Sequence, residues 1–237
     1  MNQYPGQSRG LPSELGIRPA ARLSVGLLSQ AFTWMFAGLL LTAGVAWLVQ
    51  TTPRLYDLAR DLMLPAIIVE LVIAFGIQLL IRRISAVVAL GLFFAFAAIN
   101  GLTIGLIVSA YSTASVAAAF FSAAGMFGAA AVYGATTKRN LTSIGGYLTM
   151  GVFGLLIAMV VNMFLGSSPI GYLISIIGVG IFVVLTAFHV QRIASGDIAA
   201  MTGSMEKGAV FSALLLYLDF INLFLFLLRL FGGSSRR

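Results

Sequence analysis

The last long apolar stretch of the chain decides the fold: residues 209–231 read AVFSALLLYLDFINLFLFLLRLF. A helix needs about 20 apolar residues to cross the ~30 Å hydrocarbon core of a bilayer, and this stretch is long enough. Its charged residues are Asp219, near the middle, and Arg229, near the end. The stretch therefore predicts a membrane-spanning helix that carries one acidic side chain at depth.

The rest of the chain is equally apolar. Of its 237 residues, 60% are hydrophobic and 9% are charged, whereas a soluble domain carries about 25% charged residues. The absence of cysteine and the single histidine exclude disulfides, a catalytic cysteine and metal sites built from thiolates or several histidines. The net charge of +7 is divided among short segments without a basic–aromatic motif, so we expect no nucleic-acid partner. The composition predicts an all-α integral membrane protein that has the lipid bilayer as its surroundings.

Seven apolar runs are long enough to span a bilayer, with short polar or Gly/Pro-marked connections between them. Residues 1–22 are rich in Pro, Gly and Arg, which predicts a flexible cytoplasmic tail before a single seven-helix domain over residues 23–237. A secretory signal is the alternative for this end, but the run 25–49 exceeds the ~7–15 residues of a signal core. The predicted spans are 25–50, 62–81, 85–110, 114–136, 144–165, 170–191 and 209–231.

Basic residues indicate the orientation, since cytoplasmic loops are enriched in Lys and Arg. Nine lie on the side of the N-terminus, which we therefore expect to be cytoplasmic, and five on the other: Arg9, Arg18, Arg22, Arg82, Arg83, Lys138, Arg139, Arg192 and Lys207, against Arg54, Arg60, Arg229, Arg236 and Arg237. Because the terminal arginines oppose a fully crossing last span, a re-entrant last hairpin is the alternative topology. Short loops without an organelle signal suit a bacterial inner membrane.

Glycines at close spacing predict tight helix packing. Gly101 precedes Gly105 by four residues, and Gly125 and Gly128 form a similar pair, as do Gly151 and Gly154. Small residues let helix backbones approach each other within the bilayer. We expect these pairs to pack inside the chain; a dimerisation motif is the alternative.

Two carboxylic acids lie inside predicted spans. Glu70 lies about eight residues, or ~12 Å, into the second span, and Asp219 about ten residues, or ~15 Å, into the last. A carboxylate at the centre of a membrane helix costs about 2.5–3.5 kcal/mol on insertion scales, so each should face the protein interior, water or a cation. Such acids mark ion or proton paths; the alternative is a merely structural acid, and Glu70 suits a helix-bridging acceptor.

Three further polar residues lie near predicted cytoplasmic ends of spans. Packing of the sixth span against the seventh would bring His189 toward Asp219. With an ordinary pKa of about 6.5, histidine is the side chain that changes charge near neutrality. Arg82 and Arg83 end the second span, where they either reach lipid headgroups or turn inward to pair with Asp219 as a latch that protonation of the acid would release.

These residues occur in motifs that resemble the Bax inhibitor-1 family, also called transmembrane Bax-inhibitor-motif proteins. The most specific motif is Leu216–Phe224 (LYLDFINLF), followed by Leu227–Gly232 (LLRLFG). The resemblance covers nearly everything after residue 23. Supporting motifs are Leu64-Pro65 with Glu70, the Arg82-Arg83 pair, Gly101–Ile104 (GLTI) and Phe188–Gln191 (FHVQ).

The resemblance implies six helices around a central seventh, and leakage of calcium down its gradient under the control of pH. In the family, an aspartate at the end of helix six shares a proton with one on helix seven, and an arginine of helix two latches the closed state. Asp219 matches the helix-seven aspartate and Glu70 the helix-two acid, which makes these two the expected weak calcium ligands. Arg82 or Arg83 matches the latch.

The sequence departs from the family at the partner of Asp219, because His189 stands where an aspartate is usual. Two ionised carboxylates repel each other, whereas a protonated histidine attracts a carboxylate. We therefore expect acidification to charge His189 and to tighten its bond to Asp219. Calcium takes about six to eight oxygen ligands and histidine offers none, so calcium binding should be weak, with other cations as alternative cargo.

The sequence thus predicts a pH-responsive calcium or cation leak channel, with Asp219, His189 and Glu70 in the ion path and no cofactor besides the transported ion. The alternative is a non-conducting regulator of stress survival or of a membrane protease, acting on a membrane-protein partner. We expect no enzymatic activity, since an intramembrane aspartyl protease needs a second intramembrane aspartate and the other aspartates lie in predicted loops: Asp57, Asp61 and Asp197.

Overall fold

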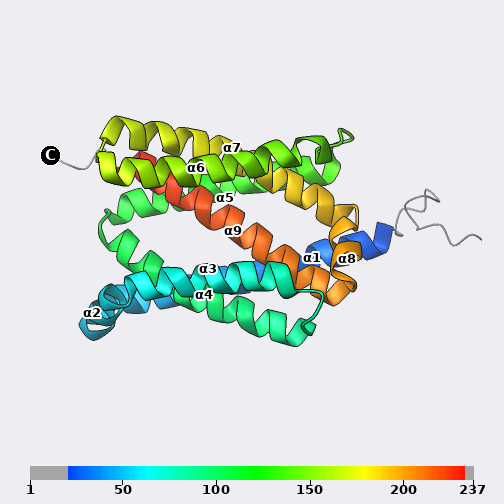
Figure 1. Cartoon of the computed structure of the whole chain (residues 1–237), viewed down its shortest axis with the longest axis horizontal. Coiled ribbons are helices and arrows are strands. Elements are labelled where there is room, and N and C mark those ends of the chain that lie inside the picture. The colour runs from blue at the N-terminus through cyan, green and yellow to red at the C-terminus, as the bar shows by residue number, and fades with distance from the viewer. Residues whose placement is uncertain (1–20, 233–237) are drawn as a thin grey trace, which may run out of the picture.

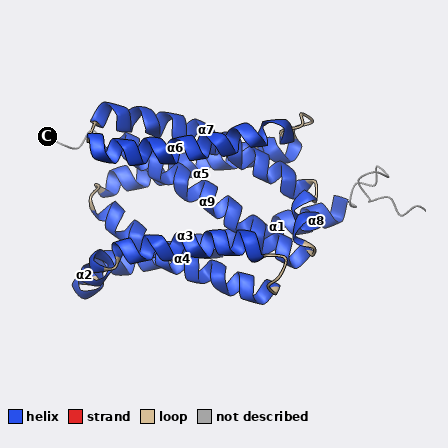
Figure 2. Ribbon diagram, viewed as in Figure 1, coloured by secondary structure: helices blue, strands red, loops and turns tan. Residues whose placement is uncertain are grey.

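The computed structural model describes residues 21–232, and within them the chain is helical without any strand (Figure 2). Seven segments of this part are long and apolar enough to cross a membrane, which confirms the predicted fold class. The predicted tail, residues 1–22, lies outside the described residues except for the start of α1, and so do Arg236 and Arg237. The spanning helices are α1 (Ala21–Thr51), α3 (Met63–Leu80), α4 (Ala86–Ser109), α5 (Thr113–Thr136), α6 (Gly145–Leu165), α7 (Ser168–Ala194) and α9 (Met205–Gly232).

Short helices occupy connections that the sequence analysis treated as loops. Helix α2 (Pro53–Asp61) has proline in its first turn, where the missing N–H has no partner to lose. Helix α8 (Asp197–Thr202) lies between Gly196 and Gly203, whose φ angles are 81° and 85°. Glycine adopts this left-handed conformation without a Cβ penalty, so the pair sets both ends of α8. A 3₁₀ turn, η1 (Thr142–Ile144), precedes α6.

Helix α9 forms the centre of the bundle and crosses it diagonally in Figure 1. In the most apolar window of α9, 78% of the residues are buried, against 6% in the segment Thr142–Leu165 that contains α6. Helix α9 packs against α1, α4, α5 and α7 and touches α3, while α6 packs against α7 on the outside. The predicted arrangement around a central C-terminal helix is confirmed, with α6 the helix most exposed to lipid.

The last span crosses the bundle once. Helix α9 is continuous from Met205 to Gly232, so the alternative of a re-entrant hairpin is wrong. It begins at the end of the bundle where α1 begins and finishes at the opposite end (Figure 1). The connections that follow α3, α5 and α7 lie at the end where α1 begins. We call it the basic end because Lys and Arg residues lie in these connections or in the helix turns beside them: Arg82, Arg83, Lys138, Arg139, Arg192 and Lys207.

The glycine pairs differ in their surroundings. A Cβ added to Gly101 would lie 2.7 Å from the Cβ of Val45, and Gly105 is similarly crowded by α1. Helices α1 and α4 therefore approach each other closely through this pair, as expected of packing within the chain. Gly125 and Gly128 have no atom within 4 Å of an added Cβ, so for them the packing prediction is wrong.

Candidate functional site

Asp219 of α9 and His189 of α7 form a buried pair. The Nδ1 atom of His189 lies 2.7 Å from Oδ2 of Asp219, and the two side chains are 11% and 2% exposed. Within residues 21–232 this is the one contact of 4 Å or less between an acidic side chain and a Lys, Arg or His side chain. A ring N–H donates to the carboxylate whether the imidazole is neutral or protonated, so a change of pH alters the charge of the pair without requiring the contact to break.

Glu70 of α3 lies in a different polar cluster. Its Oε2 accepts a hydrogen bond from Nδ2 of Asn100 at 3.0 Å, and its Oε1 accepts one from the hydroxyl of Thr103 at 2.9 Å. Both donors belong to α4 and lie three residues apart, which places them on one face of that helix. Glu70 therefore bridges α3 and α4, the structural role given above as an alternative.

Tyr217 extends this cluster through α9 to α1. Its hydroxyl donates to Oδ1 of Asn100 at 2.9 Å and lies 2.6 Å from the hydroxyl of Thr42. Tyr217 is fully buried, and its ring meets those of Phe93 and Phe96 edge-on, each at 5.6 Å. Helices α1, α3, α4 and α9 are thus joined by one chain of hydrogen bonds, which we call the Glu70 network: Thr42, Glu70, Asn100, Thr103 and Tyr217.

The two acids lie on opposite sides of the central helix. Tyr217 and Asp219 are two residues apart on α9, which rotates their side chains by about 200°. The Glu70 network faces α1 and α4, whereas Asp219 faces α7. In the described part of the chain, no three acidic or histidine residues gather closely enough to hold a metal ion. Asp219 and Glu70 are therefore not joined in one calcium site in this structure.

The arginines expected to latch Asp219 lie elsewhere. Nε of Arg82 donates to the carbonyl of Met201 in α8 at 2.6 Å, and Nζ of Lys207 donates to the carbonyl of Arg82 at 3.1 Å. Arg83 is exposed. Asp219 follows the first residue of α9 by roughly 20 Å at about 1.5 Å per residue, whereas Arg82 bonds to α8 at the basic end. The predicted contact between an arginine and Asp219 is not formed in this structure.

Sequence comparisons with known proteins identify the family of this chain. A family model described as inhibitor of apoptosis-promoting Bax1 matches residues 25–236. The chain belongs to the Bax inhibitor-1 family. Inner membrane protein YbhL of Escherichia coli strain K12 is 39% identical to it over 92% of this chain and 95% of that protein. An uncharacterized protein of Deinococcus radiodurans is 41% identical over 88% and 90% of the two chains. This member of the Bax inhibitor-1 family is a multi-pass membrane protein, and the family is not known for enzymes.

Most of the Glu70 network in this Bax inhibitor-1 family member was not predicted from its sequence. Asn100 and Tyr217 lie inside predicted spans, where a polar group without a hydrogen-bond partner is costly. Their position was therefore a signal that both side chains have hydrogen-bond partners. The spacing of Asn100 and Thr103 on one helical face was a further signal. The bond from Arg82 to Met201 had no such signal, because the acceptor is a backbone carbonyl that any residue offers.

Proposed function

We propose that this Bax inhibitor-1 family protein is a pH-responsive cation leak channel, with calcium as the cation by resemblance to its family. The observation that supports this most is the contact between Asp219, on the central helix, and His189, the only histidine of the chain. A cation that crosses the bundle along α9 needs a negative group at depth, and Asp219 supplies one. Histidine supplies a charge that changes near neutrality.

The charge of His189 sets the direction of the response. Acidification protonates the imidazole, which then attracts the Asp219 carboxylate and neutralises its charge toward a passing cation. Deprotonation leaves only a hydrogen bond between the two, which is weaker and easier to open. Flux should therefore fall as the pH falls. Asp219 is 1% exposed, which fits a closed state.

The other predicted site residues take supporting roles in this proposal. Glu70 is a half-buried acid that acts as a second binding site for a cation, together with the carbonyl and hydroxyl oxygens of its network. Arg82 binds α8, and α8 connects α7, which carries His189, with α9, which carries Asp219. Arg82 therefore acts on the opening of the His189–Asp219 pair through α8. A cation site with one carboxylate and an imidazole favours weak binding and rapid release.

Calcium flux into liposomes tests the proposal. The Asp219→Asn variant keeps the shape of the side chain but removes its charge, and we expect its flux to fall to the level of empty liposomes. The matched control is Asp57→Asn, an exposed acid of α2, which should conduct as wild type does. Equal flux through wild type and Asp219→Asn, above that of empty liposomes, would exclude Asp219 from the ion path. Flux through wild type no greater than through empty liposomes would instead favour the non-conducting regulator.

A further inference from the structure

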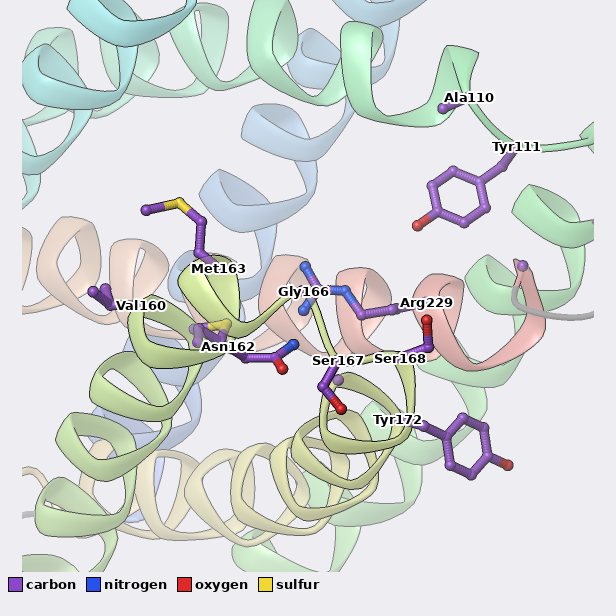
Figure 3. Close-up of a pocket in the computed structure, with 13 residues that line it drawn as sticks. Ala110, Tyr111, Val160, Asn162, Met163, Gly166, Ser167, Ser168, Tyr172 and Arg229 are labelled. Carbon is purple, nitrogen blue, oxygen red and sulfur yellow. The ribbon is translucent and has the colours of Figure 1, made fainter.

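A cavity of about 960 Å³ opens at the end of the bundle where α9 finishes, opposite the basic end. Its walls come from the α4–α5 turn, the last turns of α6, the α6–α7 turn, the start of α7 and the end of α9 (Figure 3). Neither Asp219, His189 nor any member of the Glu70 network lines it. The cavity is therefore separate from the proposed ion path.

One part of the lining is suited to an anion. Arg229 is the charged residue of the lining, and in Figure 3 its side chain extends from α9 toward the α6–α7 turn at Gly166. Helix α7 begins in the same wall at Ser168, and its first turn adds the positive end of a long helix. A guanidinium binds the oxygens of a phosphate through two parallel hydrogen bonds.

A second feature of the cavity points independently to a ligand. The Oδ1 atom of Asn162 is buried and has no hydrogen-bond partner within the described part of the chain. A buried acceptor without a donor is unfavourable by about 1–3 kcal/mol. Asn162 lines the same cavity as Arg229, so rotation of its amide toward the cavity would let Oδ1 accept from a hydroxyl or ammonium donor of a ligand whose phosphate binds Arg229.

The opposite part of the lining is apolar and faces lipid. Met159, Val160 and Met163 of α6 line it, and α6 is the spanning helix with the smallest buried share. Val160 and Met163 are 55% and 72% exposed. An acyl chain fits along these side chains, whereas a free phosphate ion would make no use of them.

We propose that this cavity binds the headgroup of an anionic glycerophospholipid. The phosphate binds Arg229 and the start of α7, a glycerol hydroxyl donates to Oδ1 of Asn162, and one acyl chain lies along the last turns of α6. Phosphatidylglycerol has all three parts. The lipid fastens the end of α9 to the α6–α7 turn, at a site remote from the His189–Asp219 pair.

Native mass spectrometry of the detergent-purified protein, titrated with phosphatidylglycerol or phosphatidylcholine, tests this site. We expect wild type to retain phosphatidylglycerol at least about tenfold more tightly than phosphatidylcholine, and Arg229→Gln to lose this preference. Arg83→Gln, an exposed arginine at the basic end, is the matched control and should keep it. Equal retention of both lipids by wild type, or an unchanged preference in Arg229→Gln, overturns the proposal.

Two further arms keep the test decisive if Arg229→Gln does not fold. Asn162→Asp has nearly the same shape but adds a negative charge beside the phosphate, so it should weaken retention of phosphatidylglycerol by about tenfold or more. Unchanged retention in this variant counts against the site. Inorganic phosphate, added as a competitor, should displace phosphatidylglycerol only weakly because it lacks the acyl chain. Displacement at equal concentrations would assign the cavity to a free anion and overturn the lipid.

Discussion

Asp219 and Glu70 are both carboxylic acids within spanning helices, and the protein surrounds them differently. Asp219 is buried and has one polar partner, the imidazole of His189 on α7. Glu70 is half-buried and accepts from two neutral donors, Asn100 and Thr103 on α4. The first acid depends on a partner that, in the function proposed above, changes its charge with pH. The second depends on amide and hydroxyl groups whose charge does not.

We therefore assign the two acids different tasks: a pH switch for the His189–Asp219 pair and a structural brace for the Glu70 network. The Glu70 network joins four helices, and the hydroxyl and amide groups that bind Glu70 and Tyr217 in it stay neutral between pH 5 and 8, so we assign it the task of holding α1, α3, α4 and α9 together. The His189–Asp219 pair joins only α7 and α9, and in the proposed function its strength follows the protonation of one ring.

The largest expected effect is that of removing the charged partner. His189→Leu leaves the Asp219 carboxylate buried without a counter-charge, which should lower the free energy of unfolding by about 3–5 kcal/mol. Thr103→Val, in α4, leaves Asn100 still bonded to Glu70 and should cost only about 1–2 kcal/mol. Reversible unfolding in detergent measures both values. A smaller loss for His189→Leu than for Thr103→Val would contradict the comparison.

The double variant His189→Leu with Asp219→Leu is the control for the first prediction. Replacement of both partners of a buried pair by apolar residues is often neutral or stabilising, so the double variant should recover most of the lost stability. It should also fail to conduct. If the double variant is as unstable as the single variant, then poor packing of leucine at position 189, and not an unpaired charge, explains the effect of His189→Leu.

Tyr217→Phe is the next effect in size, because it removes one hydroxyl from the middle of the Glu70 network. Oδ1 of Asn100 and the hydroxyl of Thr42 each lose a partner, and the expected loss is about 1–3 kcal/mol in the free energy of unfolding. Packing against Phe93 and Phe96 is retained. Tyr147→Phe is the control, since Tyr147 is 76% exposed and should show no change.

The parts of this structure that sequence predicts best are those set by hydropathy. Spans of about 20 apolar residues follow from the thickness of the bilayer, and their number and order were predicted correctly. The pairing of His189 with Asp219 depended on an expected contact between the last two spans, which the structure contains. The direction of the Arg82 side chain was not predictable, because it depends on where α8 lies in space and not on any charge in the sequence.

The response of calcium flux to pH is the third prediction and addresses the switch directly. Lowering the external pH from 8 to 6 should reduce flux, by at most about tenfold per pH unit for a single titrating group. His189→Ala should abolish the dependence, while Tyr217→Phe should preserve it. Glu70→Gln is informative in the same assay. If it abolishes the response and His189→Ala does not, the switch and the brace have been assigned to the wrong acids.

The smallest effect is expected at the basic end, where Arg82 holds α8. Arg82→Ala removes one exposed hydrogen bond to the carbonyl of Met201, so its effect on global stability should stay below about 1 kcal/mol. Hydrogen exchange of residues 197–203 should quicken, because opening of α8 requires only local unfolding. Arg83→Ala is the matched control and should leave this exchange unchanged. If Arg82→Ala instead changes calcium flux as strongly as Asp219→Asn does, then Arg82 acts on the acid itself, and the direct latch expected from the family replaces the route through α8.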